Sequence, residues 1–229
     1  MHIKNCRVGP LDTSQNMLRV SELRCERDER VLFSELTLDF GRSELVQIKG
    51  ANGAGKTTLL RILAGLYSYY EGAVSSNGQN ILEDLSAHHQ SLFFMSHKTS
   101  VKSALTAREN LVYLCGIAGF SPSVVVIDEA LAEIGMRGYE DVVCSEMSAG
   151  QQRRVVLASL LISNAPILML DEPFTSLDVA GVAQLEALLL KKAQAGALVI
   201  FTSHHRVEVD GVRSIELSEL ASVKQGDAR

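Results

Sequence analysis

The sequence contains no tryptophan, only four prolines, and no cysteine pair with the spacing of a metal or redox motif. Its four cysteines are Cys6, Cys25, Cys115 and Cys144. Without a C-x-x-C arrangement, we expect inert thiols in a reducing compartment rather than disulfides. Adjacent His88 and His89 would diverge from a regular element, so we expect them in a solvated loop rather than at a metal.

The chain also lacks an apolar run of the roughly 18–20 residues that a membrane-spanning helix needs. Its best stretch, "VVLASLLISNAPILML", is interrupted by Ser159, Ser163, Asn164 and Pro166. The N-terminus has no apolar signal-peptide core. The net charge of −5 argues against a nucleic-acid partner, which basic patches would bind. We therefore expect a cytoplasmic protein whose membrane role, if any, comes through a partner.

The composition fits one sizeable α/β domain, because hydrophobic residues make up 46% and charged residues 21% of the 229 positions. Residues 1–16 show no apolar periodicity. We interpret them as a flexible leader, or as upstream sequence if translation begins at Met17. Residues 17–229 are then expected to form the single domain.

The strongest motif is a phosphate-binding loop. Gly50–Thr57 matches G-x-x-x-x-G-K-[ST] at every fixed position. An apolar strand is predicted before it, at residues 45–48, and a helix is predicted after it, from the helical spacing of leucines in "TTLLRILAGL". Strand, glycine loop and helix are the setting in which this motif binds nucleotide.

Each residue type in the loop has a physical reason. Gly53 and Gly55 allow backbone angles that turn successive N–H groups toward phosphates. The helix N-terminus adds its positive dipole end. Lys56 supplies a charge for the β- and γ-phosphates, and Thr57 offers a hydroxyl to Mg²⁺. The loop therefore predicts a site for ATP with Mg²⁺.

Two further apolar strands are each followed by candidate catalytic or metal-binding residues. Residues 167–170 form a continuous apolar run, followed by Asp171 and Glu172. Parallel sheets place ligands at their carboxyl edge, so Asp171 is a candidate for Mg²⁺ and Glu172 for a general base. The strand at residues 198–201 leads to His204, which could reach a γ-phosphate or be an ordinary surface histidine.

The stretch "EMSAGQQRRV" suggests a second phosphate-facing surface. Ser148 and Gln151 have the spacing of a helix capping box, which by itself indicates only a good helix start. The free N–H groups and dipole of that helix start would also attract an anion.

The strings "GANGAGKTT", "MSAGQQRR", "LMLDEP", "SLD" and "TSH" occur in this order. Over residues 17–221 they resemble the ATP-binding subunits of ABC transporters. The resemblance implies a P-loop NTPase fold of the ABC ATPase type: a RecA-like parallel sheet, a small antiparallel β subdomain and an inserted helical subdomain, roughly residues 98–148. It also implies an ATP hydrolase coupled to transport that works as a homodimer arranged head to tail.

By the same resemblance, roles are expected for these residues. Nucleotide and Mg²⁺ would be bound by Gly50, Ala51, Asn52, Gly53, Ala54, Gly55, Lys56, Thr57 and Thr58. Asp171 would face Mg²⁺ with Thr57, Glu172 would be the base, and His204 would be the switch histidine. Ser148, Gly150 and Gln151 would cover the ATP of the other copy, and Asp178 would link the two sites.

Two positions depart from the family pattern. A glutamine that senses the membrane subunit is replaced by His97, and imidazole is a poorer Mg²⁺ ligand than an amide oxygen. We expect His97 to keep the role of sensing the membrane subunit without contacting Mg²⁺ directly. The aromatic residue that stacks on adenine is also missing from "CERDER". Arg27 falls closest, and a guanidinium plane can stack on a base.

Two helices are expected within the inserted subdomain. Thr106 and Glu109 have capping-box spacing at the start of "TARENLVYL". For "SPSVVVIDEALAEIG" we expect Ser121 as the cap, Pro122 as the first helical residue and Gly135 as the stop.

Longer strings, among them "MSHKTSVKSALTARENL" and "LDEPFTSLDVAGVAQL", resemble the branch that serves cytochrome c maturation (haem export) in bacteria. This implies CcmB-type integral membrane subunits as partners and a place on the cytoplasmic face of the inner membrane. The work done would be haem export or release of a haem-loaded chaperone. Direct haem binding is not expected, because no C-x-x-C-H motif occurs. An unrelated transport substrate, or a soluble ABC ATPase acting on nucleic acid, stays as an alternative.

Overall fold

The computed structural model describes residues 16–97, 100–205, 207 and 209–217. A parallel sheet forms its centre, in the order β6-β7-β8-β3-β9. All neighbouring strands in it are parallel. Its strands are β3 (Leu45–Lys49), β6 (Leu92–Met95), β7 (Ile167–Asp171), β8 (Leu198–Thr202) and β9 (Val212–Glu216). The three strands predicted from apolar runs are therefore confirmed as β3, β7 and β8.

A second, antiparallel sheet has the order β2-β1-β4-β5. Its strands are β1 (Asn16–Arg27), β2 (Arg30–Gly41), β4 (Glu71–Ser76) and β5 (Gln79–Asn80). Asn16 already belongs to β1, one residue before the predicted start of the domain, and the rest of the predicted leader lies outside the described residues. The predicted pairing of a parallel core with a small antiparallel subdomain is confirmed.

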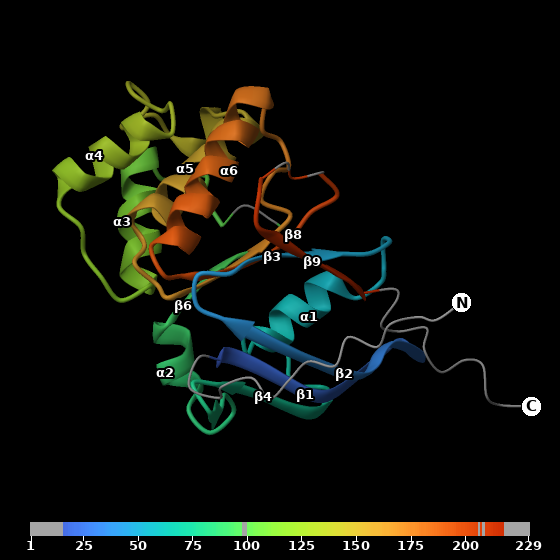
Figure 1. Ribbon diagram of the computed structural model, residues 1–229. Helices are drawn as coiled ribbons and strands as arrows, with labels where there is room; N and C mark the ends of the chain where they lie inside the picture. Colours follow the sequence, from blue (N-terminus) through green and yellow to red (C-terminus); the bar gives the residue numbers. More distant parts are fainter. Residues whose placement is uncertain (1–15, 98–99, 206, 208, 218–229) are drawn as a thin grey trace, which may run out of the picture.

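The helices are distributed over two layers. α1 (Lys56–Leu63) lies between the two sheets, and α2 (Leu85–Gln90) precedes β6 (Figure 1). On the other side of the parallel sheet lie α3 (Ala107–Ile117), α4 (Val124–Glu133), α5 (Ala149–Ile162) and α6 (Val179–Gln194) (Figure 1). A short 3₁₀ helix, η1 (Cys144–Glu146), leads into α5.

Two hydrophobic cores follow from this layering. Leu168 and Leu170 of β7 face the core beneath the helices, whereas Ile167 and Met169 face the core shared with α1 and the antiparallel sheet. Successive side chains of a strand point to opposite faces, so a strand covered on both sides must be apolar throughout. This is why β7 and β8 read as continuous apolar runs.

The predicted helical subdomain contains α3, α4 and η1, and both helices pack against α5, which follows it. Its first predicted residues, 98 and 99, lie outside the described ones. α3 begins with the predicted capping box between Thr106 and Glu109. The predicted start of α4 was wrong: Ser123, not Ser121, accepts from the N–H of Val126, and the helix begins at Val124 and not at Pro122. Gly135, with φ +79°, follows the helix end as predicted.

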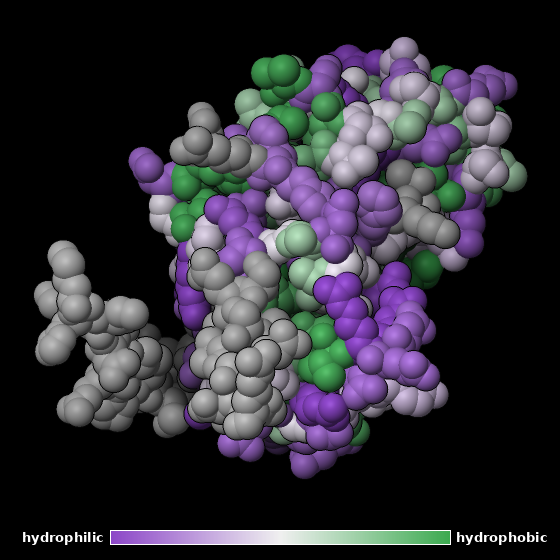
Figure 2. Space-filling model, turned by 90° about the vertical axis from the view of Figure 1, so that its right-hand side faces the viewer, coloured by the Kyte–Doolittle hydropathy of each residue, from purple (hydrophilic) through white to green (hydrophobic). Residues whose placement is uncertain are grey.

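No helix among the described residues is both long and apolar enough to cross a bilayer. On the face shown in Figure 2, hydrophilic residues cover much of the visible described surface, and hydrophobic residues form separate areas.

The expectation for the adjacent histidines was wrong. They lie on α2, and His88 is buried. Nε2 of His88 lies 2.9 Å from the carbonyl oxygen of Leu63, and Nε2 of His89 lies 3.0 Å from that of Ala64. Both rings thus contact carbonyl groups at the C-terminal end of α1. Leucine spacing alone gave no sign of this packing between α1 and α2.

Burial lowers the pKa of His88, opposed by its hydrogen bond to Leu63, with a further small lowering from His89. An unfolded histidine titrates near pH ~6.5, so below that pH the unfolded chain binds more protons than the folded one. We expect the free energy of unfolding to fall as the pH drops from about 7 to 5, by up to about 1.4 kcal/mol per pH unit from this residue. Urea denaturation at several pH values would measure it.

The variant His88→Gln should show a weaker decline, because glutamine keeps a donor for Leu63 but does not titrate. His89→Gln serves as the control. An unchanged slope in His88→Gln would contradict the expectation.

Candidate nucleotide site

The carboxyl ends of four neighbouring strands meet at one edge of the parallel sheet. β3 leads to the glycine loop, β6 to His97, β7 to Asp171 and Glu172, and β8 to His204. Ligands of parallel α/β sheets bind at this edge, outside the strand ends. The topology therefore assembles side chains that are almost 150 residues apart in the sequence.

The glycine loop adopts the conformation that its sequence requires. Gly53 and Gly55 have φ of +77° and +96°, in the left-handed region. A Cβ atom on Gly55 would also lie only 3.1 Å from Cβ of Leu32. Glycine is thus needed for both backbone angle and space. α1 begins at Lys56, so its first N–H groups border the loop.

Lys56 is held within the loop. Its Nζ donates to the carbonyl oxygens of Gly50 at 2.7 Å and Ala51 at 3.2 Å. Lys56 is only 8% exposed. The ammonium charge is therefore kept beside the loop instead of extending into solvent.

Asp171 lies directly behind the loop and is 2% exposed. The hydroxyl of Thr57 donates to both of its carboxylate oxygens at 3.0 Å. The hydroxyl of Thr202 donates to Oδ1 at 2.8 Å. Hydroxyl and carboxylate oxygens are ligands that suit Mg²⁺, so Thr57 and Asp171 together form a fitting pair for this ion.

Glu172 is placed beside His204. Oε2 of Glu172 accepts from the backbone N–H of His204 at 3.3 Å, and Nε2 of His204 lies 3.5 Å from Oε1. The backbone N–H of Glu172 donates to Oγ1 of Thr202 at 2.9 Å. Glu172 has φ of +50°, an uncommon backbone conformation for a residue with a side chain. Contacts around it must hold this conformation.

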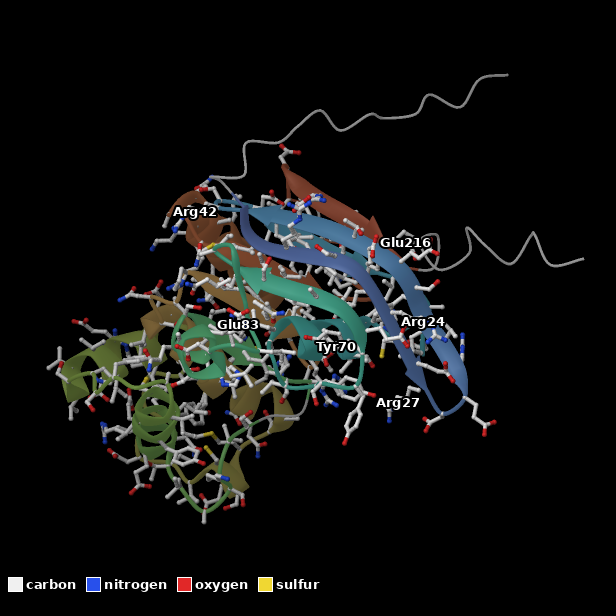
Figure 3. All side chains as sticks on the ribbon, turned by 90° about the horizontal axis from the view of Figure 1, so that it is seen from below. Arg24, Arg27, Arg42, Tyr70, Glu83 and Glu216 are labelled. Carbon is white, nitrogen blue, oxygen red and sulfur yellow. The ribbon has the colours of Figure 1, made fainter. Side chains whose placement is uncertain are left out.

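A cavity of about 590 Å³ adjoins these groups. It brings together most of the predicted nucleotide-site residues: Arg27, Asn52, Gly53, Ala54, Gly55, Lys56, Thr57, Thr58, His97, Glu172 and His204. Gly50 and Ala51 instead contact Lys56 through their carbonyl groups, and Asp171 lies behind Thr57. Arg27 stands at the turn between β1 and β2, away from Arg42 at the other end of that pair (Figure 3).

The remaining predicted residues line a separate hollow. Ser148, Gly150, Gln151 and Asp178 line it, together with Gly135, Met136, Tyr139, Arg154 and Ser176. None of them lines the cavity at the glycine loop. One chain therefore carries two distinct polar surfaces.

The predicted capping box at the start of α5 is confirmed. Oγ of Ser148 accepts from the N–H of Gln151 at 3.2 Å, and Oε1 of Gln151 accepts from the N–H of Ser148 at 2.9 Å. A Cβ atom on Gly150 would lie 2.9 Å from the carbonyl oxygen of Ser176. The helix tip thus packs closely against the segment that leads to α6.

Asp178 caps α6 by accepting from the N–H of Gly181 at 2.9 Å and from Nη2 of Arg154 at 2.9 Å. The hydrogen bond from Gly181 and the charge of Arg154 lower the pKa of Asp178. Arg154 also donates to the carbonyl of Ile134 at 3.0 Å. The two helix starts and the end of α4 are thereby tied together.

Sequence reasoning missed several residues of the cavity wall: Asp28, Arg30, Leu32 and Thr175. It also missed Thr202, which bonds both members of the acidic pair. Arg30 lies in the same "CERDER" string as Arg27, which was a usable signal. Thr202 is the last residue of β8, at the carboxyl edge of the parallel sheet. Its place at the end of an apolar strand was the only sign in the sequence that it lies near Asp171.

Residues 33–175 match the family model described as "ABC transporter". "Cytochrome c biogenesis ATP-binding export protein CcmA" of Saccharophagus degradans is 46% identical over 206 residues, covering 86% of this chain and 91% of the relative. The protein of that name from Vibrio cholerae is 45% identical over 205 residues, covering 89% and 99%.

Among solved structures, an ATP-binding protein from Pyrococcus furiosus, described as a putative ABC transporter, matches with a TM-score of 0.79 at 24% identity, covering 90% of this chain and 99% of that one. A dimeric ATP-binding cassette in a post-hydrolysis state with ADP and phosphate matches with a TM-score of 0.71 at 24% identity, covering 82% and 88%. These two likenesses concern the fold.

The fold, the glycine loop and the acidic strand end, together with the match to the family model, define an ABC-type ATPase, which binds ATP and couples its hydrolysis to transport. The capped helix start before the acidic strand agrees with this class. The chain belongs to the ABC transporter family and, within it, to the cytochrome c biogenesis ATP-binding export proteins called CcmA.

Proposed function

We propose that this chain hydrolyses ATP for a transporter that serves cytochrome c biogenesis, either in haem export or in releasing a haem-loaded chaperone. One observation carries the proposal: relatives named for this process are 44–46% identical over most of the chain. At that identity over nearly the full length, the relatives share more than the fold and the nucleotide loop.

The nucleotide would occupy the cavity at the glycine loop. Residues 50–58 would hold the phosphates through backbone N–H groups and the Lys56 ammonium. Arg27, with Arg30 and Leu32 beside it, would form the wall for the base. Thr57 and Asp171 would hold Mg²⁺, which supplies charge neutralisation at the phosphate oxygens.

Glu172 is the proposed general base. Its carboxylate borders the cavity, and a base must lie within reach of the water that it deprotonates. The water oxygen would bond to the γ-phosphorus as the bond to the β-phosphate oxygen breaks, and Glu172 would accept the water proton. His204 lies beside this carboxylate and is 56% exposed, so its ring is free to turn toward a γ-phosphate.

Two copies are proposed to face each other head to tail. The separate hollow at Ser148, Gly150 and Gln151 supports this arrangement, because it offers helix N–H groups away from the chain's own glycine loop. The tip of α5 would cover the ATP of the other copy, and Asp178 would lie between the sites. Each site would then need both chains.

CcmB-type integral membrane subunits are the proposed partners, and the cytoplasmic face of the bacterial inner membrane is the proposed place. α3 and α4 expose apolar side chains in support of a protein contact there: Val112, Ile117, Val124 and Val125, which are 53–68% exposed. His97, at the end of β6 before the helical subdomain, would sense that contact.

Capture from membranes tests the proposal. The tagged chain, purified from membranes solubilised in a mild detergent, should bring down CcmB-type subunits identifiable by mass spectrometry. Val125→Glu should reduce the captured amount about tenfold or more, because it places a charge in an apolar contact. Leu82→Glu is the control, since Leu82 is 48% exposed beyond β5 and away from α4.

Membrane subunits of an unrelated transporter would refute the assignment to cytochrome c biogenesis while keeping the ATPase role. Recovery of nucleic acid or ribosomes in place of a membrane subunit would favour the soluble alternative.

A further inference from the structure

Arg153 stands out because its charged side chain is buried. It lies on α5 and is 2% exposed. A charge is excluded from a protein interior unless hydrogen bonds and opposite charges compensate it. The compensation here is specific: every hydrogen bond that the guanidinium makes to the described residues goes to a backbone carbonyl.

These carbonyls belong to two strand ends of the nucleotide site. Nη2 donates to Glu172 at 2.6 Å and to Asp171 at 3.5 Å, and Nε donates to Pro173 at 3.2 Å. Nη1 donates to Ser96 at 3.3 Å, the residue before His97. One planar side chain thus connects the segment after β7 with the segment after β6.

Arg153 contacts the backbone at Glu172, a residue with an uncommon backbone conformation. Glu172 has φ of +50°, and its buried Oε1 makes no hydrogen bond to a described residue, its polar neighbour being Nε2 of His204 at 3.5 Å. A rotation about φ of Glu172 would move its carbonyl group as well. A donor fixed at 2.6 Å from that carbonyl therefore favours this conformation over the alternatives.

The guanidinium also keeps its charge. Burial lowers the pKa of Arg153 to about 10, and the charges of Asp171 and Glu172 oppose the shift. The group is still protonated near neutral pH. Its positive charge lies behind the two carboxylates, on the core side of the site.

We propose that Arg153 is a positioning residue for ATP hydrolysis, which holds the Asp171–Pro173 backbone so that the Glu172 carboxylate stays directed at the nucleotide cavity. The proposal rests on the proposed role of Glu172 as the base. Because Ser148 caps α5 and Arg153 lies in its second turn, the same helix that would cover the other copy's ATP also holds this chain's own Glu172. Arg153 thus lies on the helix whose start lines the second hollow and contacts the backbone of Glu172 at the nucleotide cavity.

Two variants keep the test independent of folding failure. Arg153→Lys keeps the charge but loses most of the donors, and Arg153→Gln keeps donors but loses the charge. With either, we expect kcat to fall about 10- to 100-fold, the size of effect that small misplacements of catalytic groups produce. The Kd for ATP, measured without turnover, should stay within about twofold of the wild type.

Leu157→Ala is the matched control, because Leu157 is 1% exposed one turn further along α5 and its apolar side chain cannot donate a hydrogen bond to these carbonyls. Its thermal midpoint should fall at least as far as that of Arg153→Lys, while kcat changes little. If kcat falls equally in both at a similar loss of midpoint, Arg153 only stabilises the fold.

A double-mutant cycle with Glu172→Gln isolates the coupling. Since Arg153 acts through Glu172, adding Arg153→Lys to Glu172→Gln should change the residual kcat little. If the losses of kcat in the two single variants multiply in the double variant, Arg153 does not act through Glu172 and the positioning role is refuted. Wild-type turnover in Glu172→Gln alone would refute the role of Glu172 as the general base. The Arg153 single variants do not test that role, so the two failures can be told apart.

Discussion

Replacing Glu172 by glutamine should leave ATP binding intact and abolish most turnover. The amide has nearly the same shape, so the hydrogen bond from the N–H of His204 can persist. It cannot accept the proton of the attacking water. We expect kcat to fall about 10²- to 10⁴-fold, the usual contribution of a general base. Phosphate release under saturating ATP measures this loss.

The same variant should accumulate as an ATP-bound dimer. If ATP holds two copies together and hydrolysis separates them, Glu172→Gln should form a dimer on addition of ATP that size-exclusion chromatography with light scattering detects. Lys56→Ala provides the contrast, because it removes the ammonium beside the glycine loop and should weaken nucleotide binding itself. Normal turnover in Glu172→Gln would refute the assignment of the base.

The second large effect concerns the tip of α5. In Ser148→Arg, a long cationic side chain replaces the small hydroxyl at the helix start, and we expect turnover to fall about 100-fold or more by blocking the facing site. Binding of ATP to the isolated chain should not change, because Ser148 does not line the cavity at the glycine loop. Equilibrium binding at low protein concentration and turnover at high concentration separate the two.

Ser148→Asp distinguishes a helix cap from a phosphate contact. Aspartate caps helices as well as serine does, so the fold should be retained. Its negative charge would repel the γ-phosphate of the other copy. Loss of turnover with an unchanged thermal midpoint supports the contact across the dimer, and Ser148→Thr should retain activity. Full turnover in Ser148→Asp would leave only the capping role.

Both predictions depend on the proposal that each nucleotide site is completed by a second copy of the chain. Turnover per chain should therefore rise steeply with protein concentration, since Ser148 and Gln151 lie in a hollow of their own. The contacts around this surface show how it is held: the capping box fixes the start of α5, and Arg154 hydrogen-bonds to Asp178.

Local sequence patterns predicted the elements whose causes are local. The apolar runs of β7 and β8, the glycine loop and the capping boxes at Thr106 and Ser148 depend on residues within a few positions of one another. The predicted start of α4 at Ser121 and Pro122 was wrong, because Ser123 caps a helix that begins at Val124.

Contacts between distant segments were beyond such patterns. His88 looked like part of a solvated loop, yet it packs against the carbonyl of Leu63 from another helix. Thr202 bonds Asp171 from a neighbouring strand, and Leu32 comes within 3.1 Å of the position of a Cβ on Gly55. None of these pairs is close in the sequence, so no periodicity or spacing could predict them.

By itself, the sequence determined the chemistry that this protein carries: a phosphate loop, an acidic strand end, a histidine strand end and a capped helix tip, each set by neighbouring residues. Only the tertiary structure decided which of them meet, because the order of strands in the parallel sheet places the first three at one edge and leaves the helix tip in another hollow. It alone also placed the buried charge of Arg153 against the Glu172 backbone, since a guanidinium finds its carbonyl partners only after the chain has folded.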